Sequence, residues 1–145
     1  MGTNFYFYTK SKETADRMGP KAEVTDYPEF GYEIHIAKTS CGWLPLFEAH
    51  RDIRSVKDLR QFYIENKGRD NTLTILDEYE TTYDWHEFKK RVIEFGTPKH
   101  WNAKDRCYDG NWRCETDNDC RQPWNHWEGE WKDSQGYRFQ EADFC

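Results

Sequence analysis

The stretch Tyr32-Glu33-Ile34-His35-Ile36-Ala37-Lys38 alternates apolar and polar residues, which is typical of a β-strand with one buried face. On a regular strand, Ile34 and Ile36 would face one way, and Glu33, His35 and Ala37 would face the other. After Thr39-Ser40-Cys41-Gly42, the apolar run Trp43-Leu44-Pro45-Leu46-Phe47 predicts a second strand, which Pro45 makes an edge strand or a bulged one. Together the two segments predict a hairpin.

The rest of the chain builds a sheet and two helices around this hairpin. Residues 3–9, 72–76 and 136–139 predict further strands, and the polar residues 10–30 predict a loop with one helical turn around 11–18. Ser55-x-x-Asp58 begins a helix that ends at Gly68, and Asp84-x-x-Glu87 begins a helix that ends at Gly96 and Pro98. We therefore predict an α+β fold, a small antiparallel sheet with two helices packed on one face. It forms a single domain (1–145) with a Trp/Cys-rich irregular C-terminal insertion (97–133).

Composition sets the kind of core and narrows the function. The 145 residues include only 5 Leu, 6 Ile and 3 Val but 9 Phe, 9 Tyr and 7 Trp, so we expect an interior dominated by aromatic rings. The net charge of −6 argues against a protein that coats nucleic acid by bulk charge. No apolar run approaches the length of a membrane span, and the N-terminus lacks a secretory pattern. We expect a location in the cytoplasm, where the five cysteines are thiols or metal ligands rather than disulfides.

The predicted hairpin carries the first candidate site. An ammonium, two hydroxyls and the turn amides suit a phosphate or carboxylate, and a tryptophan suits a stacked base. The candidate ligand-binding residues are His35, Lys38, Thr39, Ser40, Trp43 and His50. The same spacing also fits an ordinary polar sheet face with a hydroxyl-rich turn.

The segment after residue 98 carries the second candidate. Cys107, Cys114, Cys120 and His126 could supply three thiolates and one imidazole to zinc, although their spacing is not that of a C-x2-C knuckle. Buried thiols explain the cysteines equally well. Five tryptophans fall between residues 101 and 131, and Trp112, Trp124 and Trp127 are candidates for binding a partner protein. Tryptophans in the core are the alternative.

A third group consists of carboxylates. Asp77, Glu78 and Glu80, near Asp84 and Glu87, could hold Mg²⁺ in a phosphodiesterase or nuclease. Acidic residues are also favoured at helix starts by the helix dipole, which is the stronger interpretation.

Four segments resemble a group of small bacteriophage proteins: Met1-Gly2-Thr3-Asn4-Phe5-Tyr6, Glu33-Ile34-His35-Ile36-Ala37-Lys38-Thr39-Ser40-x-Gly42-Trp43, Ile75-Leu76-Asp77-Glu78-Tyr79 and Gly136-Tyr137-Arg138-Phe139. Many members place a Cys-x-x-Cys pair between the first two strands, which this chain lacks, since residues 9–33 contain no cysteine. The resemblance does not extend to residues 97–133, and the group offers no established activity to carry over.

The resemblance implies a phage accessory protein directed at a host defence. Two modes of action fit the residues. The first is binding of a phosphorylated nucleotide-type ligand at the hairpin. The alternative is inhibition of a host defence protein through the Trp-rich segment, and a metal-assisted phosphodiesterase is a weaker third possibility.

Overall fold

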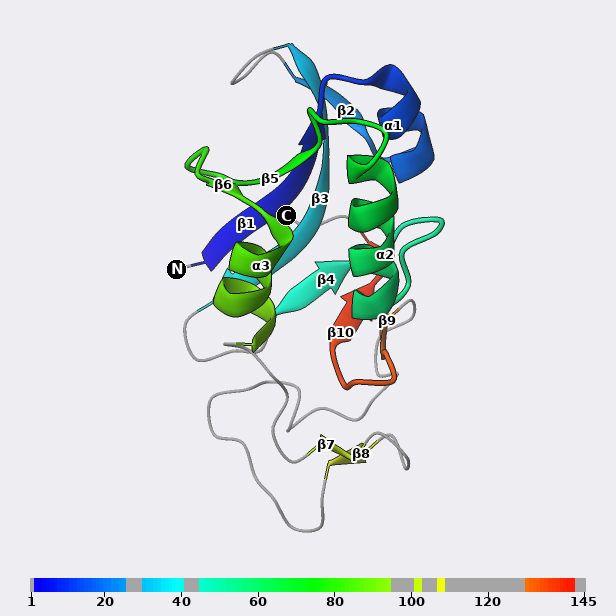
Figure 1. Cartoon of the computed structure of the whole chain (residues 1–145). Coiled ribbons are helices and arrows are strands. Elements are labelled where there is room, and N and C mark those ends of the chain that lie inside the picture. Colours follow the sequence, from blue (N-terminus) through cyan, green and yellow to red (C-terminus); the bar gives the residue numbers. More distant parts are fainter. Residues whose placement is uncertain are drawn as a thin grey trace.

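A computed structural model describes residues 2–25, 30–40, 45–94 and 130–142, together with the backbone of 101–102 and 107–108 (Figure 1). Within these residues the chain forms a mixed sheet and a set of short helices. The elements in chain order are β1 (Gly2–Thr9), α1 (Lys12–Met18), β2 (Glu23–Thr25), β3 (Gly31–Ser40), β4 (Leu46–Glu48), α2 (Val56–Lys67), β5 (Thr74–Asp77), β6 (Thr82–Tyr83), α3 (Trp85–Phe88), the π-helical turn η1 (Lys89–Glu94), β7 (Trp101–Asn102), β8 (Cys107–Tyr108), β9 (Glu130–Lys132) and β10 (Arg138–Gln140).

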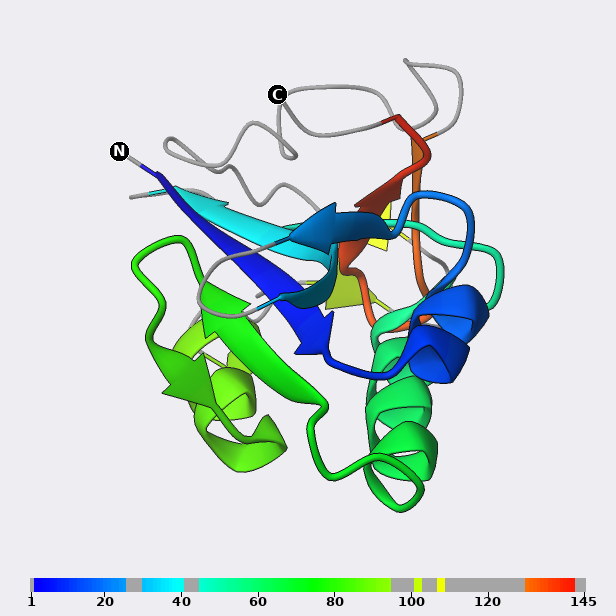
Figure 2. The same ribbon diagram turned by 90° about the horizontal axis from the view of Figure 1, so that it is seen from above.

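The sheet of eight described strands forms the centre of the fold, and the α+β class is confirmed. Seven strands follow the order β6-β5-β1-β3-β4-β10-β9, and β2 pairs with the first residues of β3. Every pair is antiparallel except β4 with β10, which run parallel. The helices α1, α2 and α3 all lie on one side of this sheet (Figure 2). The opposite side of β1 and β3 carries no described helix.

A β-bulge in β3 corrects the predicted alternation. Phe5 pairs with Ala37 but Tyr6 pairs with His35, so Ile36 is an extra residue on β3. Phe5 and Phe7 lie two residues apart and share a face, which places Ala37 on the same face as Ile34. The prediction that Ala37 faces the same way as His35 is therefore wrong, because the bulge shifts the alternation by one residue.

The core is aromatic, as predicted. Phe7 stacks on Phe62 with ring centroids 5.6 Å apart, and Phe5 meets the edge of Phe88 at 5.5 Å. Phe47 stacks on Phe139 at 5.2 Å, which joins the parallel pair of strands. All six of these rings are buried. Such pairs add about 0.5–1.5 kcal/mol beyond the burial of their area.

Both predicted helix starts are confirmed. The Ser55 hydroxyl accepts a hydrogen bond from the amide of Asp58 at 3.0 Å and caps α2, which ends at Lys67, directly before Gly68. Asp84 and Glu87 form a reciprocal capping box at the start of α3. The second helix changes into the π-helical turn η1 after Phe88, which residue spacing alone did not predict.

The sheet is larger than predicted and is mixed. The short strands β2, β6 and β9 fall in stretches without a clear alternation of apolar and polar residues, so the sequence did not predict them. The parallel pairing of β10 with β4 joins segments far apart in the chain, and such pairing leaves no local signal. No described helix is long and apolar enough to span a membrane.

Candidate functional site

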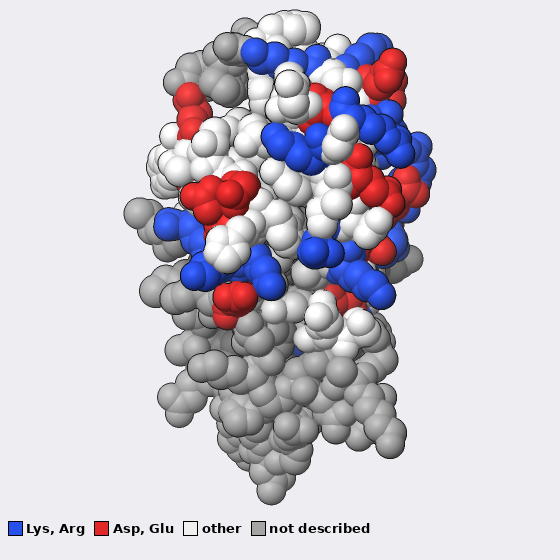
Figure 3. All heavy atoms as spheres, in the orientation of Figure 1, with Lys and Arg blue, Asp and Glu red and all other residues white. Residues whose placement is uncertain are grey.

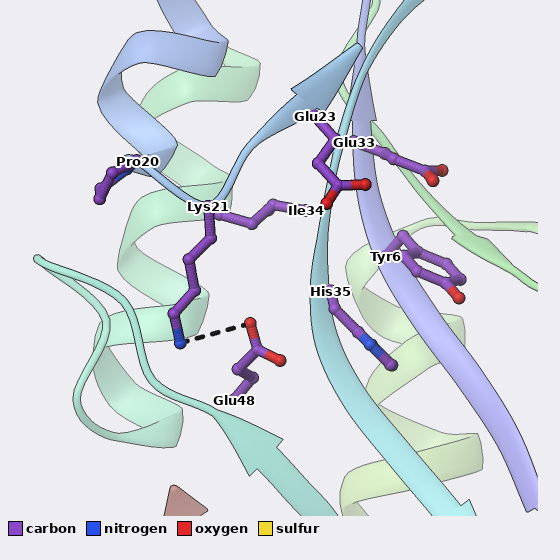
Figure 4. A pocket seen from close by; sticks show the side chains of 8 residues that line it. All are labelled: Tyr6, Pro20, Lys21, Glu23, Glu33, Ile34, His35 and Glu48. Carbon is purple, nitrogen blue, oxygen red and sulfur yellow. Dashed lines mark ion pairs between the residues drawn. The ribbon is translucent and has the colours of Figure 1, made fainter. Parts of the chain in front are cut away.

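A pocket of about 540 Å³ opens on the side of the sheet that carries no described helix (Figure 4). Its walls come from β1, from the segment before and within β2, and from β3 and β4. The side chains that line it are mostly charged or polar, and they are Tyr6, Pro20, Lys21, Glu23, Glu33, Ile34, His35 and Glu48. We call it the His35 pocket.

Tyr6 and His35 form an aromatic pair on one wall. They are direct partners in the antiparallel register of β1 and β3, so their side chains leave the sheet on the same side. Their rings stack with centroids 4.7 Å apart and planes inclined by 27°. Both residues are partly exposed, so this stacked pair presents a flat surface within reach of a ligand.

The imidazole of His35 is neutral at pH 7. Burial lowers its pKa from 6.5 to about 4, because the charged ring loses hydration. A hydrogen bond with the backbone of Ala37 opposes this shift, while electrostatic repulsion from Lys38 and from His50 adds to it. A neutral ring at this position offers hydrogen bonding and stacking, and it adds no positive charge for a phosphate.

His50 is a structural neighbour of the pocket and contacts the backbone of His35. Its Nε2 donates a hydrogen bond to the carbonyl oxygen of His35 at 2.7 Å and lies 3.8 Å from the Glu48 carboxylate. The residue is buried and forms an isolated bridge with Ile53. His50 therefore fixes the backbone at His35 and does not itself line the pocket.

Carboxylates dominate the charge of the pocket. Glu23 and Glu33 stand directly opposite each other on β2 and β3, and burial together with the charge of Glu23 raises the pKa of Glu33. Glu48 is buried and lies 3.6 Å from the ammonium of Lys21. The same ammonium donates to the carbonyl of Ala49 at 3.3 Å, so Lys21 is held by protein groups.

The structure brings together part of the residue set predicted for the hairpin. Lys38 pairs with Asn4 as His35 pairs with Tyr6, so Lys38 is the next side chain along the same face, outside the pocket lining. Thr39 follows Lys38 and points to the opposite face, where its hydroxyl donates to the carbonyl of Thr3 at 3.5 Å. The structure gives the backbone of Ser40 in β3, and Trp43 lies outside the described residues.

Of the residues that line the pocket, the sequence predicted only His35 as a binding residue, and it missed Tyr6, Pro20, Lys21, Glu23, Glu33, Ile34 and Glu48. The alternation of residues 3–9 could have placed Tyr6 on the polar face, and Glu33 and His35 were already assigned to one face. Nothing in the spacing of Lys21 and Glu48 indicates that they meet, because their contact depends on how β2 and β4 flank β3.

The predicted metal ligands and partner-binding tryptophans fall on a segment of which little is described. Cys107 lies in β8, where the structure gives only the backbone. Cys114, Cys120, His126, Trp112, Trp124 and Trp127 lie outside the described residues, so a zinc site and a partner surface there stay predictions. Trp131 is described and is structural: it stacks on Phe139 at 6.1 Å, and its Nε1 donates to the carbonyl of Arg54 at 3.1 Å.

Carboxylates that were considered for Mg²⁺ accept hydrogen bonds that stabilise loops and helix starts. Asp77 accepts hydrogen bonds from the amides of Tyr79 and Thr81 and from the hydroxyl of Tyr83. Glu78 accepts one from the amide of Asn4 at 2.8 Å. Among the residues described with side chains, no cluster of three or more His, Cys, Asp or Glu side chains has the geometry to hold a metal ion.

Comparisons with known proteins give no assignment. No protein-family model matches the chain, and neither the curated proteins nor the solved structures contain a match.

Proposed function

We propose that the protein binds a small nucleotide-type ligand, with the base of the ligand in the His35 pocket and its phosphate directed along β3 toward Lys38. The observation that carries the proposal is the pocket itself, which combines a stacked aromatic pair with hydrogen-bond acceptors.

The charges in the pocket support the base as the group that enters it. Carboxylates at Glu23 and Glu33 repel a phosphate but accept hydrogen bonds from the amino and imino groups of a base. The neutral His35 ring can donate or accept one hydrogen bond, and the stacked pair of His35 and Tyr6 offers an aromatic surface to a base. A base therefore satisfies both the polar and the aromatic groups of this pocket.

The position of Lys38 supports the direction of the phosphate. Lys38 leaves the same side of the sheet as His35 and is partly exposed. Its charge acts on the His35 ring, so the two side chains lie near each other. The resemblance to small phage proteins supports sequestration of a host nucleotide signal as the biological role.

The test is a panel of nucleosides and their phosphorylated forms, measured by thermal shift and then by calorimetry. Glu33→Gln should lower the affinity for nucleosides and for nucleotides alike by about tenfold or more, because it removes the charge from a charge-assisted hydrogen bond. Lys38→Ala should lower the affinity for nucleotides and leave the affinity for nucleosides unchanged. The matched controls are Glu13→Gln and Lys12→Ala on the exposed face of α1, which should change neither affinity.

Two results would contradict the proposal. One is a panel in which no nucleoside or nucleotide raises the melting temperature of the wild-type protein. The other is an equal loss of affinity in Glu33→Gln and Glu13→Gln, which would show that the effect comes from the net charge of the protein rather than from the pocket.

A further inference from the structure

A second pocket lies on the helical side of the protein, between α2 and the α3–η1 segment. It has a volume of about 510 Å³, and the turn between β9 and β10 closes one end. The residues that matter for its chemistry are Lys57, Arg60, Trp85, Lys89, Ile93 and Tyr137. Figure 3 shows this side of the protein, with Lys and Arg side chains over α2 and over the α3–η1 segment, Asp and Glu side chains beside both groups, and uncharged atoms between them. We call it the Trp85 pocket.

The rim of the Trp85 pocket is positive although the whole chain carries a net charge of −6. Lys57 and Arg60 are exposed and lie three residues apart on α2, so they project from the same side of the helix. No ion pair joins either of them to another described residue. Lys89 stands on the other wall and lies 3.7 Å from Glu94, which is the single carboxylate among the described lining residues.

The floor of the pocket is aromatic and apolar. The Trp85 ring packs beside Phe88 and Tyr63, with centroids 5.6 and 6.1 Å apart. Ile93 and Tyr137 are buried, and the hydroxyl of Tyr137 is used in a hydrogen bond to the carbonyl of Ile93 at 3.2 Å. These contacts hold the indole in place and leave part of it facing the pocket.

The indole nitrogen of Trp85, a lining residue, is a polar group for which the described protein provides no partner. Its Nε1 is buried and has no hydrogen-bond acceptor in the part of the chain that the structure describes. An indole N–H has no acceptor capacity of its own, and a buried one usually finds a partner. A ligand in this pocket with a negatively charged oxygen near Trp85 would supply the missing acceptor.

We propose that the Trp85 pocket binds a small organic anion, in which a flat or apolar body packs on Trp85 and a phosphate or carboxylate group contacts Lys57, Arg60 and Lys89. The guanidinium of Arg60 can hold two oxygens of such a group at once, and the lysines add charge. The site is separate from the His35 pocket, which lies on the other side of the sheet and is lined by carboxylates, and the inference does not depend on the function proposed there.

The experiment follows the Trp85 indole resonance in ¹H–¹⁵N spectra of the full chain, assigned by its loss in Trp85→Phe. The probes are phenyl phosphate and benzoate, with inorganic phosphate and benzyl alcohol as the separate halves of the ligand. Phenyl phosphate, benzoate or both should move the Trp85 indole resonance and bind about tenfold more tightly than either half, since only they combine the ring with the charge. The arm that binds more tightly identifies the anionic group.

Adjacent lysines on η1 supply a matched control. Lys89 lines the pocket, whereas Lys90 is also exposed but does not line it. Lys89→Ala and Arg60→Ala should each weaken binding about fivefold or more, while Lys90→Ala, which changes the net charge by the same amount, should have less than about a twofold effect.

The proposal is overturned if neither phenyl phosphate nor benzoate moves the indole resonance at up to about 10 mM, which is the weakest binding that would carry meaning for a small ligand. It is also overturned if Lys90→Ala and Lys89→Ala weaken binding equally. Because Glu33→Gln alters only the His35 pocket, binding that survives this substitution separates the outcome here from the outcome of the proposed function.

Discussion

Replacing Asp70 tests whether one buried carboxylate joins the first strand to the helical layer. The side chain is 8% exposed and accepts hydrogen bonds from the hydroxyl of Thr14 at 2.8 Å and from the hydroxyl and amide of Thr72 at 2.6 and 2.9 Å. The hydroxyl of Thr9 is a fourth donor. These donors belong to the end of β1, to α1 and to the loop after α2, so the carboxylate holds three segments together.

The cost of Asp70→Ala follows from the donors that it leaves behind. Thr72 is partly exposed and can turn toward water, whereas Thr9 and Thr14 are fully buried and lose their carboxylate acceptor. A buried donor left without an acceptor costs about 1–3 kcal/mol, and breaking a buried charged network typically costs 3–5 kcal/mol. We expect Asp70→Ala to lower the free energy of unfolding by about 3–4 kcal/mol, which is a fall in melting temperature of about 10 °C.

The dependence on pH provides the sharper version of this test. Burial by itself would raise the pKa of Asp70, but the hydrogen bonds from Thr72, Thr9 and Thr14 outweigh it and lower the pKa below 3.8. A depressed carboxyl pKa stabilises the fold above the unfolded pKa, and that contribution is lost as the pH falls through the folded value. The advantage of the wild type over Asp70→Asn should therefore be full at pH 7 and 5 and should shrink below about pH 4.

Urea denaturation of the wild type, Asp70→Ala and Asp70→Asn at several pH values measures both effects. Asp16→Ala is the control, since Asp16 is an exposed carboxylate whose pair with Lys12 should contribute less than about 0.5 kcal/mol. A loss below about 1 kcal/mol in Asp70→Ala, or an advantage over Asp70→Asn that stays constant into acid, would refute the reasoning.

Two further predictions concern the site and the helical layer. Because the pKa of His35 is lowered to about 4, the stability that its neutral ring provides is present above pH 6.5 and is lost as the pH falls toward 4, by about 1–2 kcal/mol once screening of the half-buried ring is counted. His35→Gln should flatten this part of a stability–pH curve relative to the exposed control His86→Gln, and equal curves would contradict the assignment. Asp133→Ala should cost about 2–3 kcal/mol, because the buried carboxylate accepts from the amides of Val56, Gln135 and Tyr137. Amide hydrogen exchange should accelerate at those amides, and unchanged exchange there would show that Asp133 does not hold the turn against α2.

Local patterns predicted the elements that they encode directly. The caps at Ser55 and Asp84, the aromatic core and the central strands all follow from short stretches of sequence. The bulge at Ile36 and the parallel pairing of β10 with β4 could not be predicted in this way. Both depend on how distant strands align, and a single sequence carries no direct record of that alignment.

In the candidate site, too, local patterns predicted some features, and contacts between distant segments determined the others. The alternation around His35 correctly placed Glu33 and His35 on one face, and the contact between His50 and the His35 backbone confirms that the hairpin brings these residues together. Lys38 and Thr39 were expected to act together, but neighbouring residues on a strand point to opposite sides. The Trp85 pocket was not predicted at all, because it forms where two helices and a turn meet.

The parallel pair β4–β10 has a consequence for how the protein is made. Phe47 is covered by Phe139, which leaves the ribosome about ninety residues later. At usual rates of synthesis this is a delay of roughly 5–20 s, during which the unfinished edge of the sheet stays open to other chains. The nascent protein therefore passes through a period in which a chaperone could bind that edge, and slower translation would lengthen this period.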